Sequence, residues 1–539
     1  MRCSSLLIAA AATLGLTAPL VVAHGDDPLH SGCHTKRHQL NRRQVSATGE
    51  GAAPAGGGAA AARYSCDPNT CKLPDCRCAD VKPPGNLAIE DVPQFITLTA
   101  DDGVTSFTVD ALNRLMNGRK NPNGCPVKAT YFAQLDYTNY SSVTNWYVAG
   151  HDVADHTVTH VAQPSDGEIR SNLIAMNALA GIPYRSMIGF RAPFLNYTKD
   201  TLVSLNKFQF TYDSSASSSV PATDPNTDAF WPYTLDHGMA NDCAGDVVGI
   251  CGGEPKLNGF WEIPMYSTYE SPTAPHLMDP WLDADPNVVA GWMRNTFMDH
   301  YNGNKQPFGL YSHPINLASG YPGLPDPTNK LNAINSFLDF AHSNQSMRNV
   351  WMVSNSQLLA WMRNPVPASQ LNTLDEFKCQ APQVNQDVIC NGMPEKEATV
   401  VQNCISDTPG DSLNNSPFRT CYGCPLQRPT VDVPNPPQNN ASGSLRHRIA
   451  DNCDTPFWDP IAGKCLNSGF KDETRTIGQN GEGITSTGNT NTDGATTSGG
   501  GDGYSTFGGP GSGAAAVGLP SFFAVLTLGL SALAAAMFA

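Results

Sequence analysis

Between Pro93 and Cys379, short apolar runs alternate with longer amphipathic stretches. Apolar runs of this length are typical of buried strands, and amphipathic stretches with a period of about 3.6 residues are typical of helices that cover a sheet. The runs that predict strands are Phe95–Thr99, Ala129–Phe132, Phe208–Tyr212, Phe308–Tyr311 and Val350–Val353. The alternation therefore predicts an α/β domain, which we place at residues 86–378.

Helices are expected between several of these strands. The amphipathic stretches that predict them are Asp285–Tyr301, Thr328–His342 and Ser354–Met362. Ser165 and Glu168 form a capping-box pattern, in which each side chain bonds the backbone N–H of the other residue, and Gly181 is a common helix terminator. We therefore expect a further helix between Ser165 and Gly181.

Both ends of the sequence carry patterns of processing signals. Residues 1–23 combine Arg2, an apolar run and small residues before a cleavage point, which predicts a secretory signal peptide; a retained membrane anchor is the alternative. Residues 514–539 follow the small residues 511–513 and end in an apolar run, the pattern of a glycosylphosphatidylinositol (GPI) anchor signal; a retained tail anchor is the alternative. Both signals predict a secreted protein held at the cell surface, on the outer leaflet of the plasma membrane or in the cell wall.

Low-complexity segments separate these signals from the predicted domain. Residues 24–63 comprise a pro-segment and a Gly/Ala-rich linker, and residues 467–513 are rich in Gly, Ser and Thr. The compositions of residues 44–62 and 467–513 cannot bury enough apolar area to fold, so we expect disordered linkers there.

The 16 cysteines of a secreted chain predict disulfides. Four of them crowd into residues 64–85 and predict a small disulfide staple, with a zinc site as the alternative. Residues 379–466 predict a second, Cys-rich module, whose cysteines are Cys379, Cys390, Cys404, Cys421, Cys424, Cys453 and Cys465. N-glycosylation sequons at Asn139, Asn196, Asn344, Asn414 and Asn440 fit the same compartment.

The formal net charge of −15 comes without any Lys/Arg-rich stripe. Nucleic-acid binding draws on clustered basic residues, so a nucleic-acid partner is not expected. A neutral or cationic polymer suits this surface better.

Polar residues capable of chemistry follow several predicted strands, at the carboxyl ends where α/β barrels build their active sites. These residues are Asp101, Asp102, His156, His160, Arg191, Asp213 and His313. His156 and His160 with one carboxylate would supply two imidazole nitrogens and an oxygen, a donor set that suits zinc and leaves one position open. The spacing of the two histidines also arises by chance, as His30 and His34 show, and an Asp pair before glycine also suits a turn.

The segments TADDG, HTVTH, RAPF, YDSS and LYSH occur in this order and resemble the five motifs of the polysaccharide deacetylase family, carbohydrate esterase family 4, with its NodB homology domain. CKLPDCRC, NGCPVKATYF, WPYTLD and GFWEIPM resemble the chitin deacetylase branch of that family, which is also found in animals. The resemblance covers roughly residues 64–380. It implies a distorted (β/α) barrel that hydrolyses the N-acetyl groups of chitin to give chitosan and acetate.

The resemblance also implies a role for each motif residue. Asp101 would be the general base, and Arg191 would hold it ionised and oriented. Asp102, His156 and His160 would be the metal ligands, with Zn²⁺ as the expected ion and Co²⁺ as a substitute. The backbone N–H of Phe194 would contribute to the oxyanion site. His313 would be the general acid, and Asp213 matches the carboxylate that orients it.

Three positions depart from the family pattern, and several interpretations stay open. Ala100 replaces an aromatic residue, YDSS lacks a second Asp and a Trp, and Tyr311 replaces a Leu. Trp231 and Trp261 could stack on sugar rings along a groove or belong to the core. The alternative functions are deacetylation of peptidoglycan or xylan, and non-catalytic binding of a wall polysaccharide. We expect a monomer.

Overall fold

The computed structural model describes residues 64–241, 253–344, 346–379 and 418–437, together with short strand segments at 388–389, 393–394, 402–404, 458–459 and 464–465. The predicted signal peptide, pro-segment, linkers and GPI signal lie outside the described residues. Within the described part of the chain, no helix is long and apolar enough to cross a membrane.

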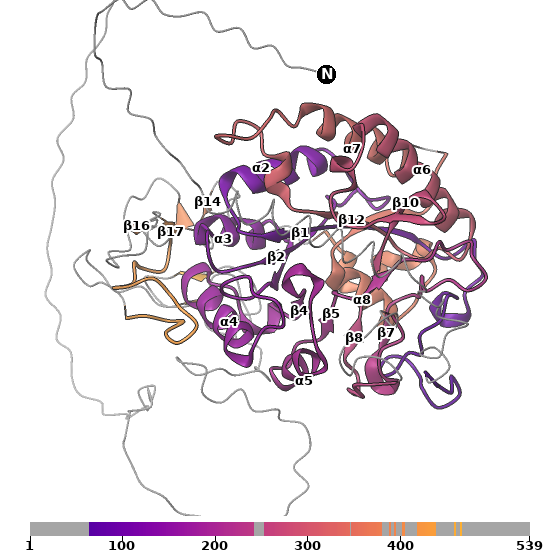
Figure 1. The fold of residues 1–539 in the computed structure, drawn as a ribbon, viewed down its shortest axis with the longest axis horizontal. Helices are drawn as coiled ribbons and strands as arrows, with labels where there is room; N and C mark the ends of the chain where they lie inside the picture. The colour runs from indigo at the N-terminus through magenta and orange to yellow at the C-terminus, as the bar shows by residue number, and fades with distance from the viewer. Residues whose placement is uncertain are drawn as a thin grey trace, which may run out of the picture. The chain divides into compact units, whose positions relative to one another are not determined.

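A nine-stranded sheet forms the centre of the fold (Figure 1). Its strands lie in the order β12-β1-β2-β3-β4-β5-β8-β7, and β13 pairs with the first half of β1. The bounds are β1 Gln94–Asp102, β2 Thr130–Ala133, β3 Asp152–Asp155, β4 Gly189–Phe190, β5 Tyr212–Asp213, β7 Tyr233–Thr234, β8 Trp261–Glu262, β12 Phe308–Ser312 and β13 Val350–Val353. All neighbouring strands run parallel except β7 and β8.

The sheet is curled, because the chain beyond β8 returns to the β12 edge. The backbone N–H of Tyr266 donates to the Tyr311 hydroxyl at 2.8 Å. Met278 forms a parallel bridge with Tyr311, and Asp279 N donates to Tyr311 O at 3.0 Å. The segment after β8 thus reaches the β12 edge of the sheet through loop contacts. The predicted α/β fold with a distorted barrel is confirmed.

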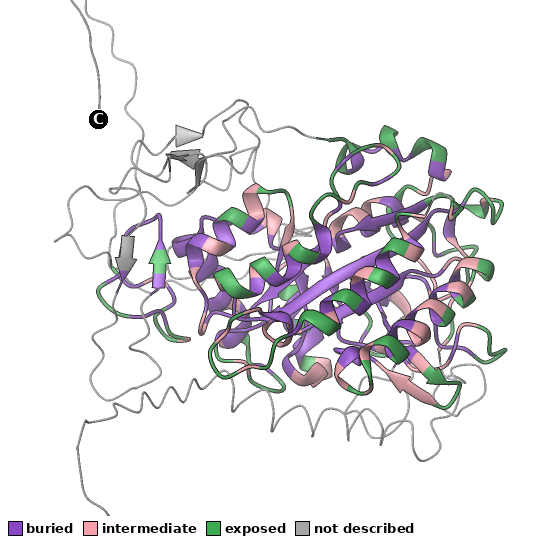
Figure 2. Cartoon of the chain, turned by 90° about the horizontal axis from the view of Figure 1, so that it is seen from above, coloured by how far each residue is buried: buried purple, intermediate pink, exposed green. Residues whose placement is uncertain are grey.

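Seven α-helices in the described part of the chain surround the sheet. They are α2 Ser106–Met116, α3 Tyr140–Val148, α4 Asp166–Ala180, α5 Lys199–Lys207, α6 Pro286–Asn302, α7 Thr328–Ala341 and α8 Asn355–Arg363. In Figure 2 the strands of the central sheet are mostly buried, and exposed residues lie in loops and on the outer faces of the helices. All nine residues of β1 are buried, as expected of a central strand in a parallel sheet covered on both faces.

Smaller two-stranded ladders complete the structure. They pair β6 Ser217–Ser218 with β9 Met265–Tyr266, β10 Thr268–Ser271 with β11 Ala274–His276, β14 Val388–Ile389 with β15 Met393–Pro394, β16 Gln402–Cys404 with β17 Phe418–Thr420, and β18 Trp458–Asp459 with β19 Lys464–Cys465. The β10–β11 hairpin leads into Asp279, a residue of the candidate site.

The predicted helices at 285–301, 328–342 and 354–362 and four of the five predicted strands are present. The strand predicted at Phe208–Tyr212 is wrong over most of its length, because Phe208 caps α5 and Gln209 takes a left-handed backbone with φ 61°. Only Tyr212 of that run belongs to β5.

The helix expected after Ser165 is also present, with Gly181 ending it at φ 67°. The Ser165 side chain accepts a hydrogen bond from Glu168 N, as predicted. The Glu168 carboxylate, however, bonds the loop before the helix: its Oε2 accepts hydrogen bonds from Val158 N and Thr159 N.

The four cysteines of the staple pair as Cys66–Cys78 and Cys71–Cys76, so they do not form a zinc site. Cys379, which the sequence pattern places in the second module, instead forms a disulfide with Cys125 after α2. This bond ties the end of the α/β domain to its first third.

Part of the predicted Cys-rich module packs on the α/β domain. Cys404, which is paired with Cys424, and Phe418 share the main hydrophobic core. The Phe418 ring meets Tyr140 of α3 edge to face at 5.3 Å. Thr420 Oγ1 donates to Leu179 O of α4 at 2.6 Å. This part of the chain therefore extends the core of the domain, and the full extent of the module stays a prediction.

Candidate active site

The polar residues singled out in the sequence lie at or just beyond the carboxyl ends of parallel strands. Asp101 and Asp102 end β1, and His156 directly follows β3. Arg191 directly follows β4, and His313 directly follows β12. Because carboxyl ends of neighbouring parallel strands meet at one edge of a sheet, these side chains come together although the sequence separates them widely.

Asp102, His156 and His160 form a compact donor set. Asp102 Oδ1 lies 3.0 Å from His160 Nε2 and 3.7 Å from His156 Nε2. One ligand atom from each residue lies within 4.8 Å of the other two. Two imidazole nitrogens and one carboxylate oxygen match the three-ligand pattern of catalytic zinc sites, so these residues fit a divalent cation.

The two buried members of this set have pKa values suited to ligation. Burial lowers the pKa of His156 to about 4, so its ring is neutral near pH 7. His156 Nδ1 lies 2.8 Å from Arg191 O and must carry the hydrogen, which leaves the Nε2 lone pair facing Asp102. Burial opposes the charge on Asp102, but the neighbouring His160 and the other histidines lower the Asp102 pKa below its usual range.

Arg191 is fully buried and holds Asp101. Its Nη1 donates to Asp101 Oδ1 and to Thr99 Oγ1, each at 2.8 Å. Nε donates to Ser214 O at 2.8 Å, Nη2 donates to Ser214 Oγ at 3.1 Å, and the guanidinium lies 4.1 Å from the centre of the Phe132 ring. A buried ion pair with this many hydrogen bonds keeps Asp101 in one orientation.

His313 pairs with Asp279, a residue for which no role is predicted from the sequence. Its Nδ1 lies 2.7 Å from Asp279 Oδ2, and its backbone N–H donates to Asp279 Oδ1 at 3.1 Å. Burial opposes protonation of His313, but Asp279, with help from Asp102 and Asp101, raises its pKa to about 9. His313 is therefore protonated at neutral pH. The weak sequence signal for Asp279 is an acid before Pro280 at the end of an apolar pair.

The assignment of Asp213 as the partner of His313 is wrong in the structure. Asp213 Oδ1 accepts from Ser215 Oγ at 2.7 Å, and Oδ2 accepts from Ser215 N at 3.1 Å. Ser215 Oγ in turn accepts from Ala192 N at 2.8 Å. Burial raises the pKa of Asp213, which lies beside Glu262 on the next strand. The YDSS motif is thus hydrogen-bonded to the RAPF segment.

Left-handed backbone conformations gather at this site. Non-glycine residues with positive φ include Asp102 (83°), Thr157 (71°), His160 (57°), Phe194 (59°) and Asp279 (48°). Such conformations are costly for residues with a side chain and persist where the surroundings impose them, often at functional sites. The Phe194 ring also packs edge to face on His160 at 4.5 Å, so the oxyanion candidate adjoins the donor set.

Comparison with known proteins agrees with this geometry. The chain is 30% identical to chitin deacetylase 8 of Bombyx mori over 341 residues, which cover 60% of this chain and 83% of that protein. The chain belongs to the polysaccharide deacetylase family. The deacetylase is also 27% identical to chitin deacetylase 1 of Bombyx mori over 396 residues, which cover 68% of each protein. No family model matches the chain.

Solved structures similar to this deacetylase include a family 4 carbohydrate esterase from Streptomyces lividans in complex with acetate, at 17% identity and a TM-score of 0.26, covering 48% of this chain and 92% of that one. Another is the chitin deacetylase of the fungal pathogen Colletotrichum lindemuthianum, at 17% identity and a TM-score of 0.22, covering 46% of this chain and 83% of that one.

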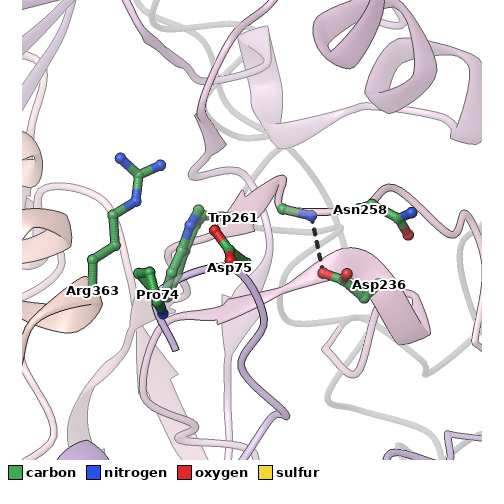
Figure 3. Close-up of a pocket in the computed structure, with 7 residues that line it drawn as sticks. Pro74, Asp75, Asp236, Asn258, Trp261 and Arg363 are labelled. Atoms are coloured by element: carbon green, nitrogen blue, oxygen red, sulfur yellow. Dashed lines mark hydrogen bonds between the residues drawn. The ribbon is translucent and has the colours of Figure 1, made fainter. Parts of the chain in front are cut away.

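Two tryptophans proposed for sugar stacking belong to the core of the deacetylase. Trp231 and Trp261 are 0% and 1% exposed, so neither offers a ring face to a polymer. Trp231 Nε1 donates to Asn304 O at 3.1 Å. Trp261 borders a pocket of about 530 Å³ with Asp75, Asp236 and Arg363 (Figure 3). Trp261 is the first residue of β8, so this pocket lies at the amino ends of the strands, opposite the candidate site.

Proposed function

We propose that this polysaccharide deacetylase removes N-acetyl groups from the N-acetylglucosamine residues of chitin, with a divalent cation, Zn²⁺, held by Asp102, His156 and His160. The proposal rests on one observation: three groups of residues lie together at one edge of the sheet. These groups are the donor set, the Asp101–Arg191 pair and the Asp279–His313 pair. Together they provide each function that amide hydrolysis needs.

The attack begins with a water molecule positioned beside Asp101. When bound, the cation supplies a Lewis acid that polarises the amide carbonyl and lowers the pKa of water. Asp101 accepts the proton as the water oxygen forms its bond to the carbonyl carbon. Arg191 keeps Asp101 in one orientation, because its guanidinium is itself held by hydrogen bonds to Thr99 and Ser214. The Phe194 backbone N–H would donate to the developing oxyanion.

Collapse of the tetrahedral state requires an acid at the nitrogen. An amine is a poor leaving group as an anion, so the C–N bond breaks only as the nitrogen gains a proton. His313 supplies this proton, because Asp279 keeps it charged at neutral pH. The products are acetate and a glucosamine residue that stays in the polymer.

The chitin assignment rests on the relatives, whose names are chitin deacetylase 8 and chitin deacetylase 1. We propose that the protein is secreted, monomeric and attached through a GPI anchor to the outer leaflet of the plasma membrane or to the cell wall. The disulfides among the described residues support an oxidising compartment.

The test is acetate release from N-acetylglucosamine oligomers with and without a metal chelator, repeated with Asp101→Asn. We expect release by the wild-type protein, loss with the chelator, recovery on adding Zn²⁺, and a loss of about 10³-fold or more in Asp101→Asn. Acetylated xylan and peptidoglycan serve as parallel substrates. Faster release from either one would contradict the chitin assignment, and no release from any of the three would contradict the enzymatic proposal.

A further inference from the structure

The loop that carries the two histidine ligands has an unusual backbone. Thr157 and His160 both take left-handed conformations, with φ 71° and 57°. For threonine, whose side chain branches at Cβ, this conformation is a true outlier that the free chain would rarely adopt. Some other part of the molecule must therefore impose the loop geometry that places His160 beside Asp102.

The backbone N–H groups of this loop all donate to side chains. Thr157 N donates to Asp155 Oδ1 at 2.8 Å. Val158 N and Thr159 N donate to Glu168 Oε2 at 3.0 and 2.9 Å. His160 N donates to Thr157 Oγ1 at 3.1 Å. Four consecutive amides are thus satisfied without any ladder or helical bond, so these side-chain acceptors define the path of the loop.

Glu168 supplies the largest share of these bonds. It lies in the first turn of α4, is 8% exposed, and accepts a third hydrogen bond on Oε1 from Thr159 Oγ1 at 2.7 Å. Hydrogen bonds to a carboxylate are stronger than those between neutral groups, and its position near the helix N-terminus favours the negative charge. These hydrogen bonds join its side chain to the loop between the two histidines.

We propose that Glu168 is a positioning residue for the metal site, acting through the Val158 and Thr159 amides to hold His160 at the distance from His156 and Asp102 that a divalent cation requires. The inference rests on the proposed metal-dependent function. Glu168 would support the donor set from outside the five family motifs, and Asp155 accepts a hydrogen bond from the first amide of the same loop, that of Thr157.

Three substitutions at Glu168 separate hydrogen bonding from charge. Glu168→Gln keeps the length and one acceptor oxygen for the two amides, and its NH₂ can donate to Thr159 Oγ1. Glu168→Asp keeps the charge but is one methylene shorter. Glu168→Ala removes the acceptor entirely. Asp166→Ala is the matched control, because Asp166 lies in the same first turn but pairs with Lys207 and Ser204 of α5.

The measurement is Zn²⁺ affinity of the metal-free full-length protein, by competition with a chromogenic chelator. We expect Glu168→Ala and Glu168→Asp to bind Zn²⁺ about 10–100-fold more weakly than the wild type, the usual effect of losing a group that orients a ligand. Glu168→Gln and Asp166→Ala should stay within about threefold of it. With Co²⁺ at saturation, the visible absorption spectrum should change in Glu168→Ala and Glu168→Asp only.

If Glu168→Ala does not fold, the difference in Zn²⁺ affinity between Glu168→Asp and Glu168→Gln still tests the positioning role. Wild-type affinity in a folded Glu168→Asp protein, or a weaker Glu168→Gln than Glu168→Asp, would overturn the positioning role. A wild-type protein that binds no Zn²⁺ would instead contradict the proposed function, so the two failures are distinguishable.

Discussion

His313 Nδ1 lies 2.7 Å from Asp279 Oδ2, although 34 residues separate them in the sequence. Ser312 Oγ and Asn316 Nδ2 also donate to Asp279, at 3.2 Å each. These donors fix the Asp279 carboxylate in front of the ring. Asp279, which follows the β10–β11 hairpin, therefore orients the His313 ring and raises its pKa.

The first prediction concerns this pair. The His313 pKa is raised to about 9, so the protonated acid is present below that pH and is lost as pH rises through it. Asp279→Asn removes the charge that raises the pKa and should move the alkaline limb of kcat/KM down by about one unit or more. The pH profile of acetate release measures this shift. Asp213→Asn is the matched control and should leave the alkaline limb in place; a shift there with none in Asp279→Asn would restore the motif-based assignment.

The second prediction concerns Arg191. Lysine cannot reproduce the planar set of donors, so Arg191→Lys leaves Thr99 or Ser214 oxygens unsatisfied and Asp101 poorly held. We expect kcat/KM to fall about 10²-fold or more and stability to fall by about 2–4 kcal/mol. Steady-state kinetics and thermal unfolding measure the two effects. The exposed Arg114, paired with Asp110 on α2, gives the control Arg114→Lys, which should change neither. Wild-type kinetics in Arg191→Lys would contradict its role.

The third prediction concerns stability at acid pH. His300 is 1% exposed, and its Nδ1 lies 3.1 Å from the carbonyl oxygens of Gln306 and Pro307. Burial lowers its pKa to about 4, so the folded protein holds it neutral. The stability that depends on a neutral His300 is complete above the pKa of the unfolded state, about 6.5. As the pH falls toward 4, the free energy of unfolding decreases by up to about 3 kcal/mol.

Thermal unfolding from pH 7.5 to 4.5 checks this sign. We expect the melting temperature to decline below about pH 6.5, and to decline less steeply in His300→Gln, which cannot be protonated. A melting temperature that rises as the pH is lowered through this window would contradict the assignment of a neutral His300.

Much of this architecture was accessible from the sequence because it depends on local patterns. Strand β1 is a continuous apolar run that ends in an Asp pair, and α4 has its cap and its terminal glycine in the expected places. The donor residues also followed from their motifs. Asp279 did not, because its partnership with His313 depends on how the sheet curls to bring the loop beyond β11 beside β12.

The wrong predictions also concern features that depend on contacts between distant parts of the chain. Phe208 and Phe210 look like strand residues, yet α5 and the positive φ of Gln209 place them in a turn that packs on the core. Trp231 and Trp261 could be assigned from the sequence to a sugar-binding groove or to the core, and the structure decides for the core, because their burial depends on the assembled sheet. Cys379 could not be paired from spacing, because Cys125 lies 254 residues earlier.

The fourth prediction concerns that long-range disulfide. In the chain-entropy picture, a bond closing 254 residues restrains the unfolded chain far more than the Cys71–Cys76 bond, which closes 5. The double substitution Cys125→Ser with Cys379→Ser should therefore cost about 3–5 kcal/mol. The double substitution Cys71→Ser with Cys76→Ser should cost less. Denaturant unfolding of both variants measures the difference, and an equal or reversed order would contradict the prediction.

The central claim is that Asp102, His156 and His160 hold one divalent cation on which deacetylation depends. The most direct measurement is a Zn²⁺ titration of the metal-free protein, with acetate release from chitin oligomers recorded at each step. We predict that activity rises linearly to a break at one Zn²⁺ per chain, and that His160→Ala shows no such break. Full acetate release from the metal-free protein, or an unchanged titration in His160→Ala, would contradict the claim.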